Sequence, residues 1–187
     1  MPSIQATADI TELLTVVLPE LTKESISARG AVEELKDTVV TITLDVSGKY
    51  YSYKVTDGSK IEFISDKIDD AMVTIRVSVD QLTKMILNKE LDIILIVITE
   101  LNRTKYETVK NLNGSFKAEL SNDDGSHYNI EVMFNGATEP NALFKMKTSD
   151  SALMMQKKEN PVNLFIAGGM QIEGDMQFSM ATQPLFV

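Results

Sequence analysis

The sequence predicts an α+β fold in which antiparallel sheets are covered by helices. Two observations lead to this prediction: apolar residues recur at intervals of three and four over residues 10–21, and they alternate with polar residues over 39–46. A third observation is that a similar order of elements starts again in the second half. With 187 residues, the chain is long enough for one compact domain or for two small halves that share a core.

The first expected element is an amphipathic helix over residues 10–21, with its apolar side chains on one face. Thr7 and Asp9 are candidates for its N-cap. Pro19 has no backbone N–H and is expected to bend this helix.

Four strands and a second helix are expected in the rest of the first half. The strands are 39–46, 51–55, 61–64 and 72–79. Ser47-Gly48 provides the turn of a hairpin between the first two strands, and Asp57-Gly58 provides the next turn. Asp80 is expected to cap the helix that follows the fourth strand.

The second half begins with a long helical stretch from Leu91 to Leu112 and then follows a similar order. Its expected strands are 116–120, 128–134, 143–148 and 170–180. The turn Asn122-Asp123-Asp124-Gly125 connects the first two of these strands. Helices are expected after Ser149-Asp150 and after Asn160-Pro161, and the second of them should end at Gly168-Gly169.

Comparison of the two halves indicates an internal repeat. At one constant offset and without a gap, three residues coincide with identical residues of the second half: Leu35, Gly48 and Tyr51 with Leu112, Gly125 and Tyr128. Identity is otherwise low, so the repeat rests on the order of the elements. We therefore expect residues 1–100 and 101–187 to be two degenerate copies that are fused into one unit.

Charge and composition exclude several classes of function. The formal net charge is -9 and the pI is about 4.7, so nucleic acid is not an expected partner. The chain has no cysteine, which excludes thiolate chemistry and is compatible with the cytoplasm. The most apolar run, residues 91–98, contains Asp92 and is far shorter than the roughly 20 residues of a membrane-spanning helix. We expect a cytoplasmic protein without stable membrane insertion.

The C-terminal part carries the most specific motif of the sequence. Residues 160–168 read NPVNLFIAG and residues 169–176 read GMQIEGDM. These segments resemble the Asn/Asp-Pro helix and the Gly-Asp strand of the sterol carrier protein type-2 (SCP2) family. Residues 34–44 and 72–91 are similar to earlier elements of the same family. The resemblance implies an SCP2-like fold and a non-catalytic function, namely the binding or transfer of a fatty acid, sterol or other lipid in an internal hydrophobic cavity.

Each half departs from the family pattern in a different element. After Leu91 the first half has no Gly-Asp strand, and in the second half the segment 136–141 is too short for a third strand. A half-sheet with an unpaired edge would be unstable or prone to aggregate. This argument favours one fused unit over two separate domains.

Methionine is concentrated in the second half, where seven of the ten methionines lie between Met133 and Met180. Flexible thioethers suit a pocket for apolar ligands, and they suit an irregular core equally well. Together with the family resemblance, this predicts a main cavity lined by residues after Met133, with the first half chiefly as scaffold. The expected ligand-binding residues are Met154, Met155, Leu164, Phe165, Met170, Ile172, Met176, Phe178 and Met180.

A continuous strand over residues 170–180 would place the last five of these residues on one face. Gly174 would lie on the same face and would allow the close approach of a ligand or a helix.

Patterns for catalysis or metal binding are not apparent in the sequence. His127 is the single histidine and is interpreted as a surface strand residue, and Asp123-Asp124-Gly125 is interpreted as a turn rather than a calcium loop. Neither a nucleophile elbow nor a paired base can be identified, so we expect no enzyme activity, no metal and no cofactor. The alternative to lipid binding is an interaction or oligomerisation domain, with a second copy or another protein as its partner.

Overall fold

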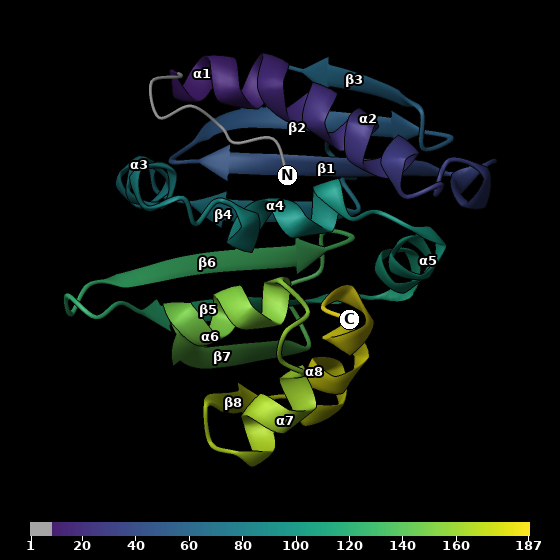
Figure 1. Ribbon diagram of the computed structural model, residues 1–187. Coiled ribbons are helices and arrows are strands. Elements are labelled where there is room, and N and C mark those ends of the chain that lie inside the picture. The colour runs from purple at the N-terminus through teal and green to yellow at the C-terminus, as the bar shows by residue number, and fades with distance from the viewer. Residues whose placement is uncertain (1–8) are drawn as a thin grey trace.

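The computed structural model describes residues 9–187, so the candidate cap Thr7 lies outside the described residues. The strands are β1 (Val39–Val46), β2 (Lys49–Thr56), β3 (Lys60–Ile64), β4 (Val73–Val77), β5 (Gly114–Ser121), β6 (His127–Phe134), β7 (Asn141–Lys147) and β8 (Met170–Gly174). The α-helices are α1 (Ile10–Glu12), α2 (Leu18–Ala28), α3 (Val79–Asn88), α4 (Asp92–Thr99), α5 (Arg103–Asn111), α6 (Thr148–Met155), α7 (Pro161–Ile166) and α8 (Met176–Thr182). All eight strands form one sheet, and α2, α4 and α6 lie over one of its faces (Figure 1). The predicted α+β fold class is confirmed.

Both halves of the chain contribute to the sheet, whose strand order is β3-β2-β1-β4-β6-β5-β7-β8. Most neighbouring strands are antiparallel, but β1 with β4 and β5 with β7 are parallel. The expected antiparallel arrangement therefore holds for five of the seven strand pairings and not for these two. Each hairpin leaves one edge of its first strand free, and a later strand, β4 or β7, pairs with that edge. The later strand runs parallel to the first strand, because the chain passes to the other side of the hairpin before the later strand begins.

The two halves meet where β4 pairs with β6, with Ile75 opposite Val132 and Arg76 opposite Glu131. Because side chains alternate along a strand, the apolar pair and the charged pair lie on opposite faces of the sheet. Arg76 forms ion pairs with Asp45 at 3.3 Å and with Glu131 at 3.1 Å. Charged side chains thus connect three neighbouring strands on the face that the helices leave open.

The expected effect of Pro19 on the first helix takes the form of a π-helical turn. Residues Leu13–Val17, between α1 and α2, form hydrogen bonds that span five residues instead of four. With this spacing the carbonyl of Leu14 would need the N–H of Pro19, which proline does not have. The hydroxyl of Tyr53 donates to that carbonyl instead, at 2.7 Å. This buried hydrogen bond ties the helix to the sheet.

Helix boundaries differ from the prediction in three places. The stretch predicted from Leu91 to Leu112 is divided into α4 and α5, because the side chain of Asn102 accepts a backbone N–H and begins a new helix. Helix α3 is capped by Ser78 rather than by Asp80. Helix α6 already begins at Thr148, before the two residues that were predicted to cap it.

The strand predicted over residues 170–180 is shorter than expected. It ends at Gly174, because the side chain of Asp175 accepts the Phe178 N–H at 2.7 Å and caps α8. The prediction that five residues of this segment share one strand face is therefore wrong, since three of them lie in a helix. Gly174 has a φ of +91°, and a Cβ at this position would lie 2.6 Å from the Asn141 carbonyl oxygen. The close approach that this glycine permits is to the backbone of β7.

Candidate ligand site

An apolar cavity of about 50 Å³ lies between the sheet and the helices α4 and α6. Its wall contains side chains from β4, β5, β6, β7, both helices and the C-terminal end of the chain. These residues are Ile75, Ile93, Ile94, Phe116, Ala118, Leu120, Ile130, Val132, Phe144, Met146, Ser151, Met154, Met155 and Phe186. In Figure 1 the two helices lie in front of the central strands.

The alternation of side chains along the strands builds the floor of the cavity. Every second residue faces the helices. The floor residues are Phe116, Ala118 and Leu120 in β5, Ile130 and Val132 in β6, and Phe144 and Met146 in β7. Helix α6 covers this floor with Ser151, Met154 and Met155, which lie on one helix face because their spacing is three and four.

Helix α4 closes the cavity on the side of the first half. Its residues Ile93, Ile94, Leu95 and Ile98 are all buried. A helix that is apolar on several sides must be surrounded by protein. α4 meets this requirement because it contacts α2 on one side and α6 on the other.

The cavity is too small for a lipid in the structure as it stands. Its volume of about 50 Å³ is well below the roughly 300 Å³ at which pockets for small molecules begin. An acyl chain therefore requires the cavity to expand. The strands are held by ladder hydrogen bonds on both sides, so the covering helices are the elements that must move.

The structure brings together two of the nine residues predicted to bind a ligand, Met154 and Met155. Four others are buried or half-buried outside the cavity wall: Leu164, Met170, Ile172 and Phe178. The remaining three are exposed at the surface: Phe165, Met176 and Met180. A ligand-binding role for these seven residues would require contacts beyond the cavity.

The predicted position of the cavity, after Met133, also needs correction. Much of the wall comes from earlier residues, such as Phe116 and Val132 in the sheet and Ile94 in α4. Methionine content indicates the residues after Met133, whereas the floor of the cavity is set by strand parity. The alternation in β5 and β6 was a signal that could have identified these residues, because a pocket floor on a sheet consists of one face of several strands.

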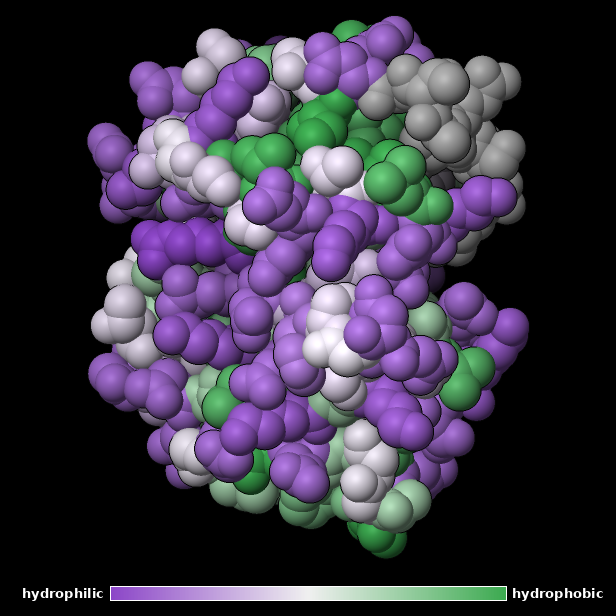
Figure 2. Space-filling view, turned by 90° about the vertical axis from the view of Figure 1, so that its left-hand side faces the viewer, coloured by the Kyte–Doolittle hydropathy of each residue, from purple (hydrophilic) through white to green (hydrophobic). Residues whose placement is uncertain are grey.

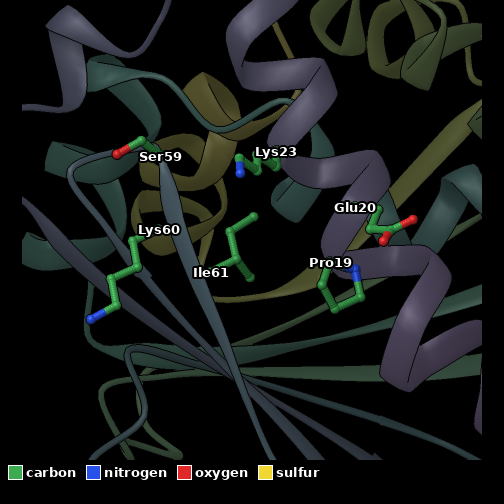
Figure 3. Close-up of a pocket in the computed structure, with 6 residues that line it drawn as sticks. All are labelled: Pro19, Glu20, Lys23, Ser59, Lys60 and Ile61. Atoms are coloured by element: carbon green, nitrogen blue, oxygen red, sulfur yellow. The ribbon is translucent and has the colours of Figure 1, made fainter.

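A larger but open groove of about 420 Å³ lies between α2 and β3 (Figure 3). Pro19 and Ile61 are its apolar residues, and Glu20, Lys23, Ser59 and Lys60 make the rest of its lining polar. The side chain of Lys60 points away from the groove in Figure 3. The groove therefore lacks the apolar enclosure that lipid binding needs.

Other features of the described residues concern metals and membranes. His127 is exposed on β6, as the sequence suggested. Among the side chains that the structure describes, no group of His, Cys, Asp and Glu could hold a metal ion. Within the same range, no helix is both long and apolar enough to cross a bilayer.

Comparisons with known proteins point to one family. Residues 97–187, slightly less than half of the chain, match the model of the SCP-2 sterol transfer family. No curated protein matches the sequence. The matched segment contains β5, β6, β7, α6 and α7, and therefore most of the cavity wall.

Several solved structures are similar at low identity. Domain 2 of a sterol carrier protein from Helicoverpa armigera is 21% identical, with a TM-score of 0.38 over 56% of this chain and 84% of that one. Sterol carrier protein 2 from Yarrowia lipolytica is 17% identical, with a TM-score of 0.40 over 59% and 94%. A structure described as "UbiJ-SCP2 Ubiquinone synthesis protein" is 10% identical, with a TM-score of 0.32 over 94% and 91%. These scores are too low to carry an argument, so the similarity to the SCP-2 sterol transfer family rests on the match of residues 97–187.

Proposed function

We propose that the protein binds or transfers an apolar small molecule, such as a fatty acid, a sterol or another lipid, without catalysing a reaction. The ligand occupies the cavity between the sheet, α4 and α6 after these helices have moved apart. One observation carries the proposal: the segment that matches the sterol transfer family is also the segment that supplies most of the apolar cavity wall.

The character of the wall supports an apolar ligand of variable shape. Thirteen of the fourteen lining residues are apolar, and Ser151 is the exception. Met146, Met154 and Met155 have unbranched side chains that adapt to different neighbours at low cost. Such a wall selects ligands by size and offers little to fix their orientation. We also propose a cytoplasmic location, because a chain without cysteine gains nothing from an oxidising compartment.

We further propose that residues 1–100 and 101–187 are degenerate copies of one unit. The support is that each half pairs a hairpin with a parallel third strand, β1-β2 with β4 and β5-β6 with β7. In the two hairpins Leu44 lies opposite Tyr51 and Leu120 opposite Tyr128. Strand β3 extends the first half and β8 extends the second. Strand β4 at the edge of the first half pairs with strand β6 at the edge of the second half, so each half supplies a neighbouring strand to the other.

An interaction domain without a lipid ligand is the second candidate. The observation in its favour is the small cavity together with exposed apolar residues on α7, namely Val162, Phe165 and Ile166. Figure 2 shows a mainly hydrophilic face whose largest hydrophobic group lies in its upper part, with smaller hydrophobic spots near its lower end. In this case a second copy or another protein would cover these residues.

Native mass spectrometry of protein purified without detergent separates the two candidates. Lipid binding predicts a near-stoichiometric mass addition that organic extraction identifies as a lipid. It also predicts a higher thermal midpoint when a fatty acid is added to delipidated protein, because a ligand of the native state stabilises it. An unliganded monomer or dimer whose midpoint does not respond to acyl lipids would contradict lipid binding and favour the interaction domain.

A further inference from the structure

A charged cluster lies at the ends of α4 and α6. Glu100 follows α4, and its Oε2 atom lies 3.3 Å from the Nζ of Lys105 and 3.3 Å from the Nζ of Lys157. Arg29, at the end of α2, reaches the same place and donates from Nη2 to the Thr99 carbonyl at 2.7 Å. Three cationic side chains from three parts of the chain therefore gather around one carboxylate.

Lys105 is the buried member of this cluster, with a side chain that is 1% exposed. Burial lowers the pKa of Lys105, and Lys157 and Arg29 lower it further, whereas Glu100 raises it. Glu34 is a second carboxylate that acts on Arg29. The cluster still has more cations than carboxylates, although the whole chain carries a net charge of -9.

The contacts of Lys105 and Lys157 with Glu100 leave N–H donors for another hydrogen-bond acceptor. Strong hydrogen bonds between an ammonium group and a carboxylate are about 2.7 to 2.9 Å long, and both lysines are farther than that from the single oxygen atom they share. Each ammonium group has three N–H donors. A second anion would therefore find donors that Glu100 does not use.

The cluster lies beyond one end of the two helices that cover the cavity, and none of its residues lines the cavity. Met155 lines the cavity, and Lys157 follows it by two residues. Along α4, Glu100 is about 9 Å beyond the lining residue Ile94, at 1.5 Å per residue. Exposure of the side chains increases from 1% for Lys105 to 17% for Glu100 and 50% for Lys157. The cluster thus combines buried and exposed charged side chains near the C-terminal ends of α4 and α6.

We propose that this cluster binds the anionic headgroup of a single-chain amphiphile whose apolar tail occupies the cavity. The inference rests on the proposed function and specifies its ligand class, which is an anionic lipid such as a fatty acid in preference to an uncharged one. Glu100 holds the two lysines in the ligand-free protein and competes with the ligand for them. A ligand carboxylate accepts from Lys105 and Lys157, while its tail separates α4 from α6.

The test compares two ligands with the same tail, decanoate and 1-decanol, by isothermal titration calorimetry on delipidated protein. The wild type should bind decanoate about tenfold more tightly, since a hydrogen bond to a charged group contributes roughly that much. Lys157→Met and Lys105→Met should each remove most of this preference and leave decanol binding unchanged. Glu100→Gln should strengthen decanoate binding, because it removes the internal competitor.

Lys158→Met is the matched control, because it removes the same charge from an exposed neighbour that forms no ion pair with the side chains that the structure describes. Lys157 is half-exposed, so its replacement tests the site even if Lys105→Met does not fold. Equal affinity of the wild type for both ligands would overturn the headgroup site, and so would an equal effect of Lys158→Met and Lys157→Met. If neither ligand binds the wild type, the proposed function itself fails and the headgroup site fails with it.

Discussion

The two halves of the molecule have similar strand arrangements but differ in their packing. Under α2, the core residues Ile42 and Leu44 are completely buried. Under α6, Phe144 and Met146 are 7% and 8% exposed to solvent, and both line the cavity. The sheet of the first half is therefore covered by a filled core, whereas the second half keeps a space that helix movement can enlarge.

Side-chain shape accounts for the difference. The inner face of β1 consists of branched aliphatic residues such as Val40, Ile42 and Leu44, which fill space closely. The cavity wall adds aromatic rings and unbranched thioethers to its branched aliphatic residues. Phe116 and Phe144 meet edge to face with their ring centroids 5.3 Å apart, and they line the cavity together with Met154 and Met155 of α6.

The largest effect on the free energy of unfolding is expected from truncating a buried side chain, and this effect should differ between the two halves. Leu44→Ala is expected to lower the free energy of unfolding by about 4 kcal/mol, because it leaves a cavity in a closely packed core. Met146→Ala should cost only about 2 kcal/mol, since this side chain already lacks neighbours on one side. Urea denaturation of both variants measures the difference. A larger loss for Met146→Ala would contradict the account of a filled first half.

Of three truncations to alanine, only the one in the cavity wall is expected to change ligand binding. Met155→Ala enlarges the cavity and should strengthen decanoate binding about tenfold, because the ligand then displaces less protein. Met85→Ala, in the buried core of the first half, should destabilise the protein and leave the dissociation constant unchanged. Phe165→Ala should affect neither property by much, because this side chain is exposed. Fluorescent fatty-acid displacement and the thermal midpoint, measured together, check all three. An unchanged affinity for Met155→Ala would exclude the ligand from the face of α6.

The contact between the end of α3 and β6 should show a smaller, pH-dependent effect. The hydroxyl of Tyr128 donates to Glu90 at 2.7 Å and accepts from Asn88 at 3.0 Å. Burial, followed by the hydrogen bond to Glu90, raises the pKa of Tyr128 to about 12. A raised phenol pKa contributes stability that is complete below pH 10 and is lost between pH 10 and about 12.

Tyr128→Phe should therefore lower the free energy of unfolding by about 1 kcal/mol at pH 8. The gap to the wild type should narrow as the pH rises from 10 towards 12. Denaturation at a series of pH values measures this gap. A gap that widens over this range would show that Glu90 does not hold the phenol in its neutral form.

The smallest effect is expected for Lys105→Met. The lowered pKa of Lys105 means that burying its charge opposes folding at neutral pH, and that this penalty declines as the pH rises towards 10.5. Glu100 keeps its contact with Lys157 in the variant, so no buried charge is left unpaired. The variant should lie within about 1 kcal/mol of the wild type at pH 7. Any advantage it has should shrink at higher pH, and a loss of several kcal/mol would contradict this balance.

Local patterns were sufficient to predict most of the fold. Two-residue alternation around Ser47-Gly48 and around residues 122–125 identified both hairpins, and Asn160 caps α7 as its sequence suggests. The parallel pairings could not be predicted in this way, because a strand with one buried face shows the same alternation in either direction. The end of the last strand was missed because Asp175 was assigned to a family motif rather than to a helix cap.

The candidate site was predicted less well than the fold. Met154 and Met155 were identified from composition, but composition carries no information on which residues face each other across the sheet. Phe165 and Met180 are apolar and yet exposed, because no element of the described chain covers them. Their position depends on tertiary contacts that periodicity does not encode.

The most direct test of the account fills the cavity. Ala118→Val adds two carbon atoms to the floor of the site and suits a β-strand, so it should raise the thermal midpoint by an amount equivalent to about 1 kcal/mol. If the cavity is the ligand site, titration calorimetry should show that decanoate binding is weakened at least about tenfold in this more stable protein. Unchanged decanoate binding at a raised thermal midpoint would contradict the claim that the ligand occupies the space between the sheet, α4 and α6.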